Sequence, residues 1–191
     1  MSQEIASVRS KLRTSTADHH RRLDDTVSEA EPFGRHDTYH SFLAAQQRAW
    51  ARLADRFGGL AHDHRWALRT AESLRLLRDD LHDLDGAASA PTDETDVEPT
   101  GVCHDPSSGL ALQYVFHGSA FGGRALASEV ESALGSRTPR RFLARAATAP
   151  GYWKEFLAEL DAFGCTTMMI DVARTAFDVH HEEFVAGAPT A

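Results

Sequence analysis

The stretch Tyr114-Val115-Phe116-His117-Gly118-Ser119-Ala120-Phe121-Gly122-Gly123-Arg124 places three glycines inside a segment with helical periodicity. A glycine in a helix interior costs about 1 kcal/mol relative to alanine, so this cluster needs a physical reason. One reason is the close approach of a flat ligand to bare backbone, beneath a helix that can bend. The other is contact with a second helix through small residues. The segment alone leaves both explanations open.

Helical periodicity continues on both sides of the glycine stretch and predicts an all-α chain. The first helix carries Ile5, Val8, Leu12, Leu23 and Val27 on one face. The second is expected to begin at an Asp37 cap and to end at Gly58-Gly59. No stretch alternates with the period of a strand, so no strands are expected. Further helices are expected over residues 63–84, 108–134 with an interruption at the glycines, 139–147, 151–163 and 166–185.

The length and composition predict one soluble globular domain. The chain has 191 residues, of which 42% are hydrophobic and 25% charged, and this fits a single domain covering residues 1–191. Residues 85–108 are rich in Pro, Ser, Thr and acidic residues and contain neither Lys nor Arg. We expect this segment to be a mobile acidic loop between helices, and residues 186–191 to be a tail.

The charge balance and the cysteines indicate which partners and which cellular compartment to expect. A formal net charge of -8 repels phosphate backbones and anionic lipid, so neither nucleic acid nor a membrane is an expected partner. Cys103 and Cys165 lie far apart and predict two ordinary thiols rather than a disulfide. The first residues carry charges and no apolar core of a signal peptide. A cytoplasmic location is therefore expected.

A polar strip runs along one edge of the first helix. Arg13, His20 and Asp24 share this strip, and His20 and Asp24 are one turn apart. A carboxylate at that spacing can accept the imidazole Nδ1–H and leave Nε2 free as a metal ligand. Arg13 lies about 10 Å away along the helix axis. His19 lies nearer the centre of the apolar face, so periodicity does not choose His20 over His19.

Two stretches together resemble the haem oxygenase family, especially the bacterial, biliverdin-producing members found beside bacteriophytochromes. Leu12-Arg13-Thr14-Ser15-Thr16-Ala17-Asp18-His19-His20-Arg21-Arg22-Leu23-Asp24 resembles the proximal helix, in which the iron-ligating histidine follows the threonine by four residues. That register selects His20. The glycine stretch resembles the distal helix. Weaker matches to the last two helices are Trp153-Lys154-Glu155-Phe156-Leu157 and Ala173-Arg174-Thr175-Ala176-Phe177.

The resemblance implies an all-α, single-domain bundle that holds haem between a proximal first helix and a distal glycine-rich helix. It assigns His20 as the iron ligand, Asp24 as its acidic partner, and Arg13 and Lys154 as propionate contacts. The distal glycines form a wall without side chains, and Ser119 anchors water. The implied catalytic residues are His20, Gly118, Ser119 and Gly122. The implied haem contacts are Arg13, His20, Asp24, Tyr114, Gly118, Gly122, Gly123, Lys154 and Phe177.

The implied activity is the oxidative opening of haem to biliverdin, CO and ferrous iron, with haem as both substrate and cofactor. The chemistry favours a neutral histidine ligand, because a thiolate would push electron density towards O–O cleavage. An external electron donor, such as ferredoxin or a reductase, is implied as a partner. A bacteriophytochrome is the candidate acceptor of the product.

The chain departs from the family pattern at three places. Ser119 stands where many members have aspartate, although the bacterial branch often has Gly-Ser. His117 stands where that branch usually has glutamate or an apolar residue. It could donate a distal hydrogen bond or pack away from haem, and we favour packing because residues 117 and 118 point to different sides of a helix. A second arginine near Ala158 is absent.

Two other functions fit parts of the sequence. A di-iron oxidase on the same fold would use the i, i+3 pairs Asp37/His40, Asp79/His82 and Asp178/His181. The first two pairs point away from the apolar faces of their helices, and no second carboxylate-rich helix completes a dinuclear site. A haem-binding or haem-storage protein would keep His20 without turnover.

Overall fold

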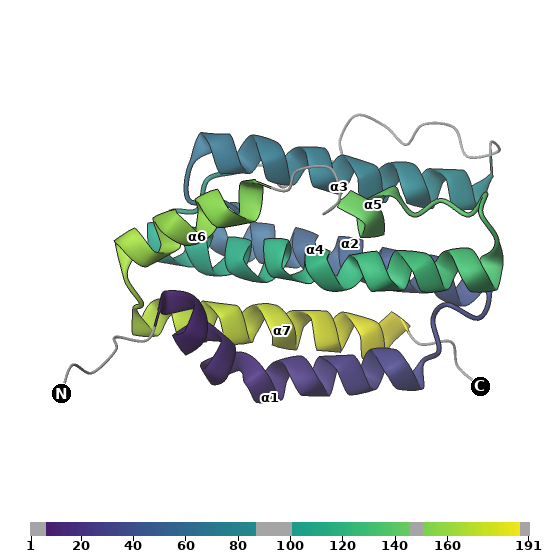
Figure 1. Ribbon diagram of the computed structural model, residues 1–191, viewed down its shortest axis with the longest axis horizontal. Helices are drawn as coiled ribbons and strands as arrows, with labels where there is room; N and C mark the ends of the chain where they lie inside the picture. The colour runs from purple at the N-terminus through teal and green to yellow at the C-terminus, as the bar shows by residue number, and fades with distance from the viewer. Residues whose placement is uncertain (1–6, 87–100, 146–150, 188–191) are drawn as a thin grey trace.

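The computed structural model describes residues 7–86, 101–145 and 151–187, and the regular elements in these ranges are all helices (Figure 1). The prediction of an all-α chain is confirmed. An isolated bridge between Ala61 and Val102 joins the connection after the second helix to the segment before the fourth. The helices are α1 Val8–Glu29, α2 His36–Phe57, α3 His64–Asp85, α4 Pro106–Leu134, α5 Arg141–Ala144, α6 Tyr152–Phe163 and α7 Thr167–Gly187.

Helix α7 lies at the centre of the arrangement. It packs on α1, α2 and α4, and Figure 1 shows it between α1 and α4. Apolar residues around much of its circumference make this possible, since a helix flanked by several partners buries more than one stripe. Helix α3 covers the other side, against α2 and α5. Helices α1 and α4 both rest on α7 but hardly on each other, which leaves a space between them.

The start of α2 differs from the prediction, whereas its end agrees with it. The N-cap is Arg35, whose side chain makes no capping bond, and Asp37 lies inside the first turn. The Asp37 carboxylate instead accepts from the Arg35 guanidinium and from the Thr38 N–H at 2.9 Å. Its charge in the first turn still favours the helix dipole. At the other end Gly58 adopts φ 74°, the left-handed conformation that glycine allows without strain.

Helix α4 begins earlier than residue 108 and continues through the glycines. Asp105 caps it by accepting from the Ser108 N–H at 2.8 Å, and Pro106 occupies the first turn, where its missing N–H costs nothing. The predicted interruption at the glycines is therefore wrong. The buried neighbours Val115, Phe116 and Ala120 stabilise this stretch enough to offset the helix propensity that glycine lacks.

The remaining boundaries agree within two residues, with one exception. The short helix expected over 139–147 is limited to α5, and residues 146–150 lie outside the described ranges. Ile5, most of the expected acidic loop (87–100) and the last part of the tail (188–191) also lie outside them. Residues 186 and 187, expected in the tail, belong to α7. The domain assignment for the whole chain stays a prediction.

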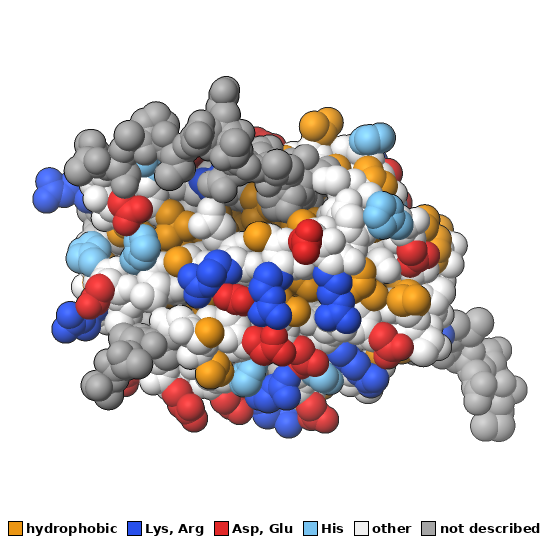
Figure 2. Space-filling model, turned by 180° about the vertical axis from the view of Figure 1, so that it is seen from behind, with side chains coloured by type: hydrophobic (Ala, Val, Ile, Leu, Met, Phe, Trp, Pro, Cys, Tyr) orange, Lys and Arg blue, Asp and Glu red, His pale blue; other side chains and the backbone are white. Residues whose placement is uncertain are grey.

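The cysteines agree with the prediction of two separate thiols. Cys103 and Cys165 are free thiols, and burial raises the pKa of Cys103 to about 11. On the face seen in Figure 2, acidic and basic side chains lie interspersed rather than in a patch of one sign. Within the described residues, no helix combines the length and apolar character needed to cross a bilayer.

Asp80 is a buried charge that ties α3 to α5. Its carboxylate accepts from Arg141 Nε at 2.8 Å and from the Phe142 N–H at 2.9 Å, and its side chain has no exposed area. We expect Asp80→Ala to lower the free energy of unfolding by about 2–4 kcal/mol, because the buried N–H loses its acceptor. Urea denaturation of the purified protein measures this loss.

Asp83→Ala provides a matched control for this prediction. Asp83 contacts the same Arg141 guanidinium, but its side chain is 49% exposed. An exposed ion pair contributes about 0–1 kcal/mol, so we expect little change in stability. Equal losses in the two variants would contradict the role assigned to Asp80.

Candidate active site

Two adjoining cavities occupy the space between α1 and α4. The outer cavity has a volume of about 840 Å³ and the inner cavity about 300 Å³. Helices α1, α4, α6 and α7 all contribute to the wall of the outer cavity. The two cavities therefore form one cleft, and they meet at the residues that line both: His20, Asp24, Val115, Gly118, Ser119 and Phe177.

His20 and Asp24 have the geometry that their spacing predicts. His20 Nδ1 lies 2.7 Å from Asp24 Oδ2, so the carboxylate can accept the Nδ1–H and leave the Nε2 lone pair free. The His20 ring also packs against Phe177 of α7, with ring centroids 5.3 Å apart. The imidazole is 58% exposed and lines both cavities, so a ligand in the cleft can reach it.

His19 faces a different neighbour. Its Nδ1 lies 2.8 Å from Asp178 Oδ1 of α7, and Arg22 contacts the same carboxylate. His19 lines neither cavity. Its position near the centre of the apolar face therefore directs it towards α7, and His20, at the edge of that face, is the histidine left for the cleft.

Arginines of α1 give the outer cavity a basic wall. Arg13, the expected propionate contact, lines it together with Arg9 and Arg21, which sequence analysis did not single out. The spacing of four residues from 9 to 13, and of eight from 13 to 21, puts all three on one face of a helix, and this signal could have revealed them. Burial raises the pKa of Tyr114 on the opposite wall, while the charges of Arg9 and Arg13 act in the other direction.

Helix α6 contributes an aromatic wall rather than a cation. Trp153 lines the outer cavity, where its ring lies 5.4 Å from that of Phe121 and 5.9 Å from the Arg9 guanidinium carbon. Lys154, the expected propionate contact, is exposed and lines neither cavity. Consecutive residues of a helix are 100° apart, so only one of this pair can face the cleft.

The three glycines of the 114–124 stretch of α4 serve two different purposes. A Cβ on Gly118 would meet only the tip of the Trp153 ring, at 3.9 Å, and a Cβ on Gly122 would meet nothing within 4 Å. These two glycines leave open space along the wall of the cleft. A Cβ on Gly123 would lie 2.7 Å from the Leu143 carbonyl oxygen, so Gly123 allows α5 to pack closely. Close packing of a second helix therefore explains Gly123, whereas the ligand explanation for Gly118 and Gly122 stays a prediction.

Ser119 is held by a buried arginine that sequence analysis missed. Its hydroxyl donates to the Phe116 carbonyl at 2.8 Å and accepts from Arg145 Nη2 at 3.1 Å. Arg145 also donates to the carbonyls of Phe116 and Phe142. Burial lowers the pKa of Arg145 to about 9, so the guanidinium remains charged at neutral pH. Because Arg145 lines the inner cavity, a positive charge lies behind the glycine wall.

His117 packs away from the cleft, as favoured from its helical position. It is buried among aromatic rings, with the Tyr152 ring centroid at 4.7 Å and that of Phe116 at 5.3 Å. Its Nε2 lies 3.3 Å from the Tyr152 hydroxyl. Burial, reinforced by the charge of Arg145, lowers its pKa to about 3, so the ring is neutral. It lines neither the outer nor the inner cavity.

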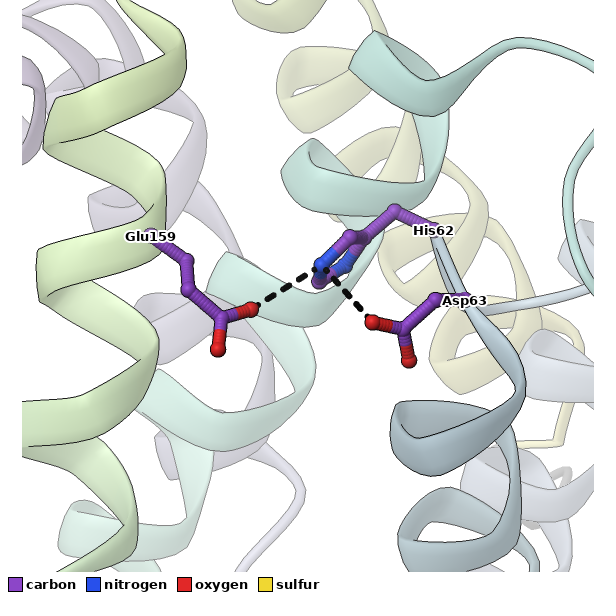
Figure 3. Close-up of side chains that lie close together, drawn as sticks. All are labelled: His62, Asp63 and Glu159. Atoms are coloured by element: carbon purple, nitrogen blue, oxygen red, sulfur yellow. Dashed lines mark hydrogen bonds and ion pairs between the residues drawn. The ribbon is translucent and has the colours of Figure 1, made fainter.

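The carboxylate–histidine pairs of a di-iron site do not come together. His40 contacts Asp85, and Asp178 contacts His19 and Arg22. In the part of the chain that the structure describes, the group able to hold a metal is His62, Asp63 and Glu159 (Figure 3), and it includes none of these pairs.

Comparison with protein-family models found no match for this sequence, and comparison with curated proteins found none either. We therefore infer function from the residues of the cleft.

The glycines lead to a prediction about the stability of the protein without added ligand. Gly123→Ala forces a methyl group against the Leu143 carbonyl and should cost about 1–3 kcal/mol. Gly122→Ala adds a methyl group in open space and should leave stability unchanged or raise it by up to about 1 kcal/mol. Thermal and urea unfolding of the two variants compare these effects. If Gly122→Ala destabilises as much as Gly123→Ala, Gly122 does not face open space.

Proposed function

We propose that this chain is a haem oxygenase, which binds haem in the cleft and opens it to biliverdin, CO and ferrous iron. One observation carries the proposal. An imidazole whose Nδ1 is held by Asp24 lines the same cleft as Gly118 and Gly122, whose missing side chains leave space. A metal-ligating histidine needs the first arrangement, and a flat ligand lying against a helix needs the second.

The cleft residues fit haem in size, shape and charge. The outer cavity falls within the range of about 300–1,000 Å³ that is typical of cofactor pockets. Phe177, Tyr114 and Trp153 offer apolar surface to a porphyrin. The arginines of α1 offer guanidinium groups to propionates, and they do so in an otherwise acidic protein. His20 Nε2 would be the iron ligand.

Bound haem would supply an iron that activates O2, using electrons from an external donor such as ferredoxin or a reductase. The chain's own residues would set the conditions. Asp24 fixes the tautomer of His20 and keeps a nitrogen ligand available. Gly118 and Gly122 leave the distal side free of side chains. The Ser119 hydroxyl, already oriented by Arg145, can hold water at the wall through its remaining lone pair.

Addition of hemin followed by ascorbate tests this proposal. We expect wild-type protein to form a histidine-ligated haem complex, whose Soret band disappears after reduction in air while bilin absorption grows. His20→Ala should lose the histidine ligand of the iron and should form no bilin, because Asp24 holds no other imidazole. His19→Ala is the matched control and should retain both, since His19 faces α7.

Three results would oppose the proposal. A Soret band that persists under reductant in air indicates a haem carrier, and the absence of any hemin complex indicates a different ligand. If His19→Ala loses the histidine ligand of the iron and His20→Ala keeps it, the iron-ligating residue is His19 rather than His20.

The basic wall leads to a prediction about haem orientation. Arg13→Ala removes a cavity-lining guanidinium and should weaken hemin binding about 3- to 10-fold, the equivalent of one lost hydrogen bond, or change the ratio of biliverdin isomers. Lys154→Ala removes an exposed charge outside the cleft and should change neither. Both variants should stay within about 0.5 kcal/mol of wild-type stability. Hemin titration and separation of bilin isomers provide the measurements. Identical behaviour of the two variants would contradict the assigned role of Arg13.

A further inference from the structure

A cluster of three side chains lies outside the cleft and consists of His62, Asp63 and Glu159. His62 precedes α3, Asp63 is its N-cap, and Glu159 projects from α6 (Figure 3). His62 Nε2 lies 3.2 Å from Glu159 Oε2 and 3.7 Å from Asp63 Oδ2. None of the three residues lines the outer or the inner cavity. The group therefore needs an explanation separate from the proposed haem site.

A buried polar network fixes which nitrogen of His62 carries the proton. The Thr70 hydroxyl donates to the Trp66 carbonyl at 2.9 Å, so its oxygen accepts from Gln113 Nε2 at 3.3 Å. Gln113 Oε1 then faces His62 Nδ1 at 3.0 Å and accepts its hydrogen. Thr70 and Gln113 are fully buried, so this orientation is firmly held. In the neutral ring, the Nε2 lone pair consequently faces the two carboxylates.

The two carboxylates are also held by groups outside the cluster. Asp63 Oδ1 accepts from the Trp66 backbone N–H at 2.9 Å, which leaves Oδ2 available. Glu159 Oε1 accepts from Arg65, and Oε2 accepts from the Trp66 indole N–H at 2.8 Å. Hydrogen bonds of this kind to the second nitrogen of a histidine and to the carboxylates orient the ligands of protein metal sites.

We propose that His62 Nε2, Asp63 Oδ2 and Glu159 Oε2 bind one divalent transition-metal ion, which fastens α6 to the start of α3. Zinc bonds of about 2.0–2.2 Å in a tetrahedron place ligand atoms about 3.3–3.6 Å apart, close to the two separations of 3.2 and 3.7 Å from His62 Nε2. Three protein ligands leave a fourth position for water. An imidazole with two carboxylates suits zinc better than calcium or magnesium.

The position of the site gives the ion a structural role. Arg65 and Arg69 of α3 already pair with Glu155 and Glu159 of α6, so the ion would reinforce an existing helix contact. The same α6 carries Trp153, which lines the outer cavity. The His62 side chain is 13% exposed and that of Glu159 31%, so an ion can enter from solvent. The ion would therefore hold one wall of the cleft in place.

Zinc binding to the 191-residue chain, without added haem, tests the site. We expect equilibrium dialysis to give one tightly bound Zn²⁺, Co²⁺ to give the intense visible absorption of a tetrahedral site, and Zn²⁺ to raise the melting temperature. His62→Gln and Asp63→Asn should each weaken binding about tenfold or more. Asn is as good an N-cap as Asp, so Asp63→Asn preserves the start of α3 and keeps the test independent of misfolding.

Two controls separate this site from the other histidines. His20→Ala removes the imidazole of the cleft, and His40→Gln removes one that is paired with Asp85 on the surface. Both variants should still bind one Zn²⁺ tightly and give the Co²⁺ spectrum of the wild type. Loss of binding in His20→Ala, binding unchanged by His62→Gln and Asp63→Asn, or no tight ion at all would overturn the proposal. The group would then serve only as a polar contact between α6 and the start of α3.

Discussion

The packing of α7 against three helices at once determines where the cleft lies. α1 and α4 each bury an apolar face on α7, and this shared support holds them apart rather than against each other. Phe177 of α7 forms the floor where the two cavities meet, beside His20. The outer cavity is thus a consequence of how the bundle is assembled. The polar and charged side chains of the cavity lie at the edges of α1 and α4. These edge residues do not have to contribute to the core.

Much of the fold and part of the cleft follow from local patterns. Periodicity located the helices, and the i, i+4 spacing of His20 and Asp24 predicted their contact. Periodicity did not separate His20 from His19, because the deciding contact is with Asp178, far along the chain. The family resemblance implied Lys154 as a propionate contact, but the angle of α6 on the bundle turns Trp153 inward instead. The choice of Asp37 as a cap failed because Arg35 satisfies its carboxylate.

Contacts between distant segments explain what the sequence could not reveal. Gly122 and Gly123 are neighbours with the same propensity, and only the Leu143 carbonyl distinguishes open space from close packing. Arg145 has no local motif, and its importance depends on folding back onto Phe116 and Ser119. In the same way, the His62 group joins α3, α4 and α6, and two of its partners, Thr70 and Gln113, are ordinary core positions in the sequence.

The buried guanidinium of Arg145 also gives the cleft an electric polarity. Water around a surface cation reorients and weakens its field, but a cation enclosed by protein acts through a medium of lower dielectric constant. Its field at the Ser119 side of the cleft is therefore set before any ligand arrives, while Asp24 supplies the opposite sign beside His20. Negative charge that develops near Ser119 during a reaction would be stabilised by dipoles and charges that need no rearrangement. The glycine side of the cleft therefore carries a fixed positive charge that is shielded from solvent, whereas the charge beside His20 is exposed to it.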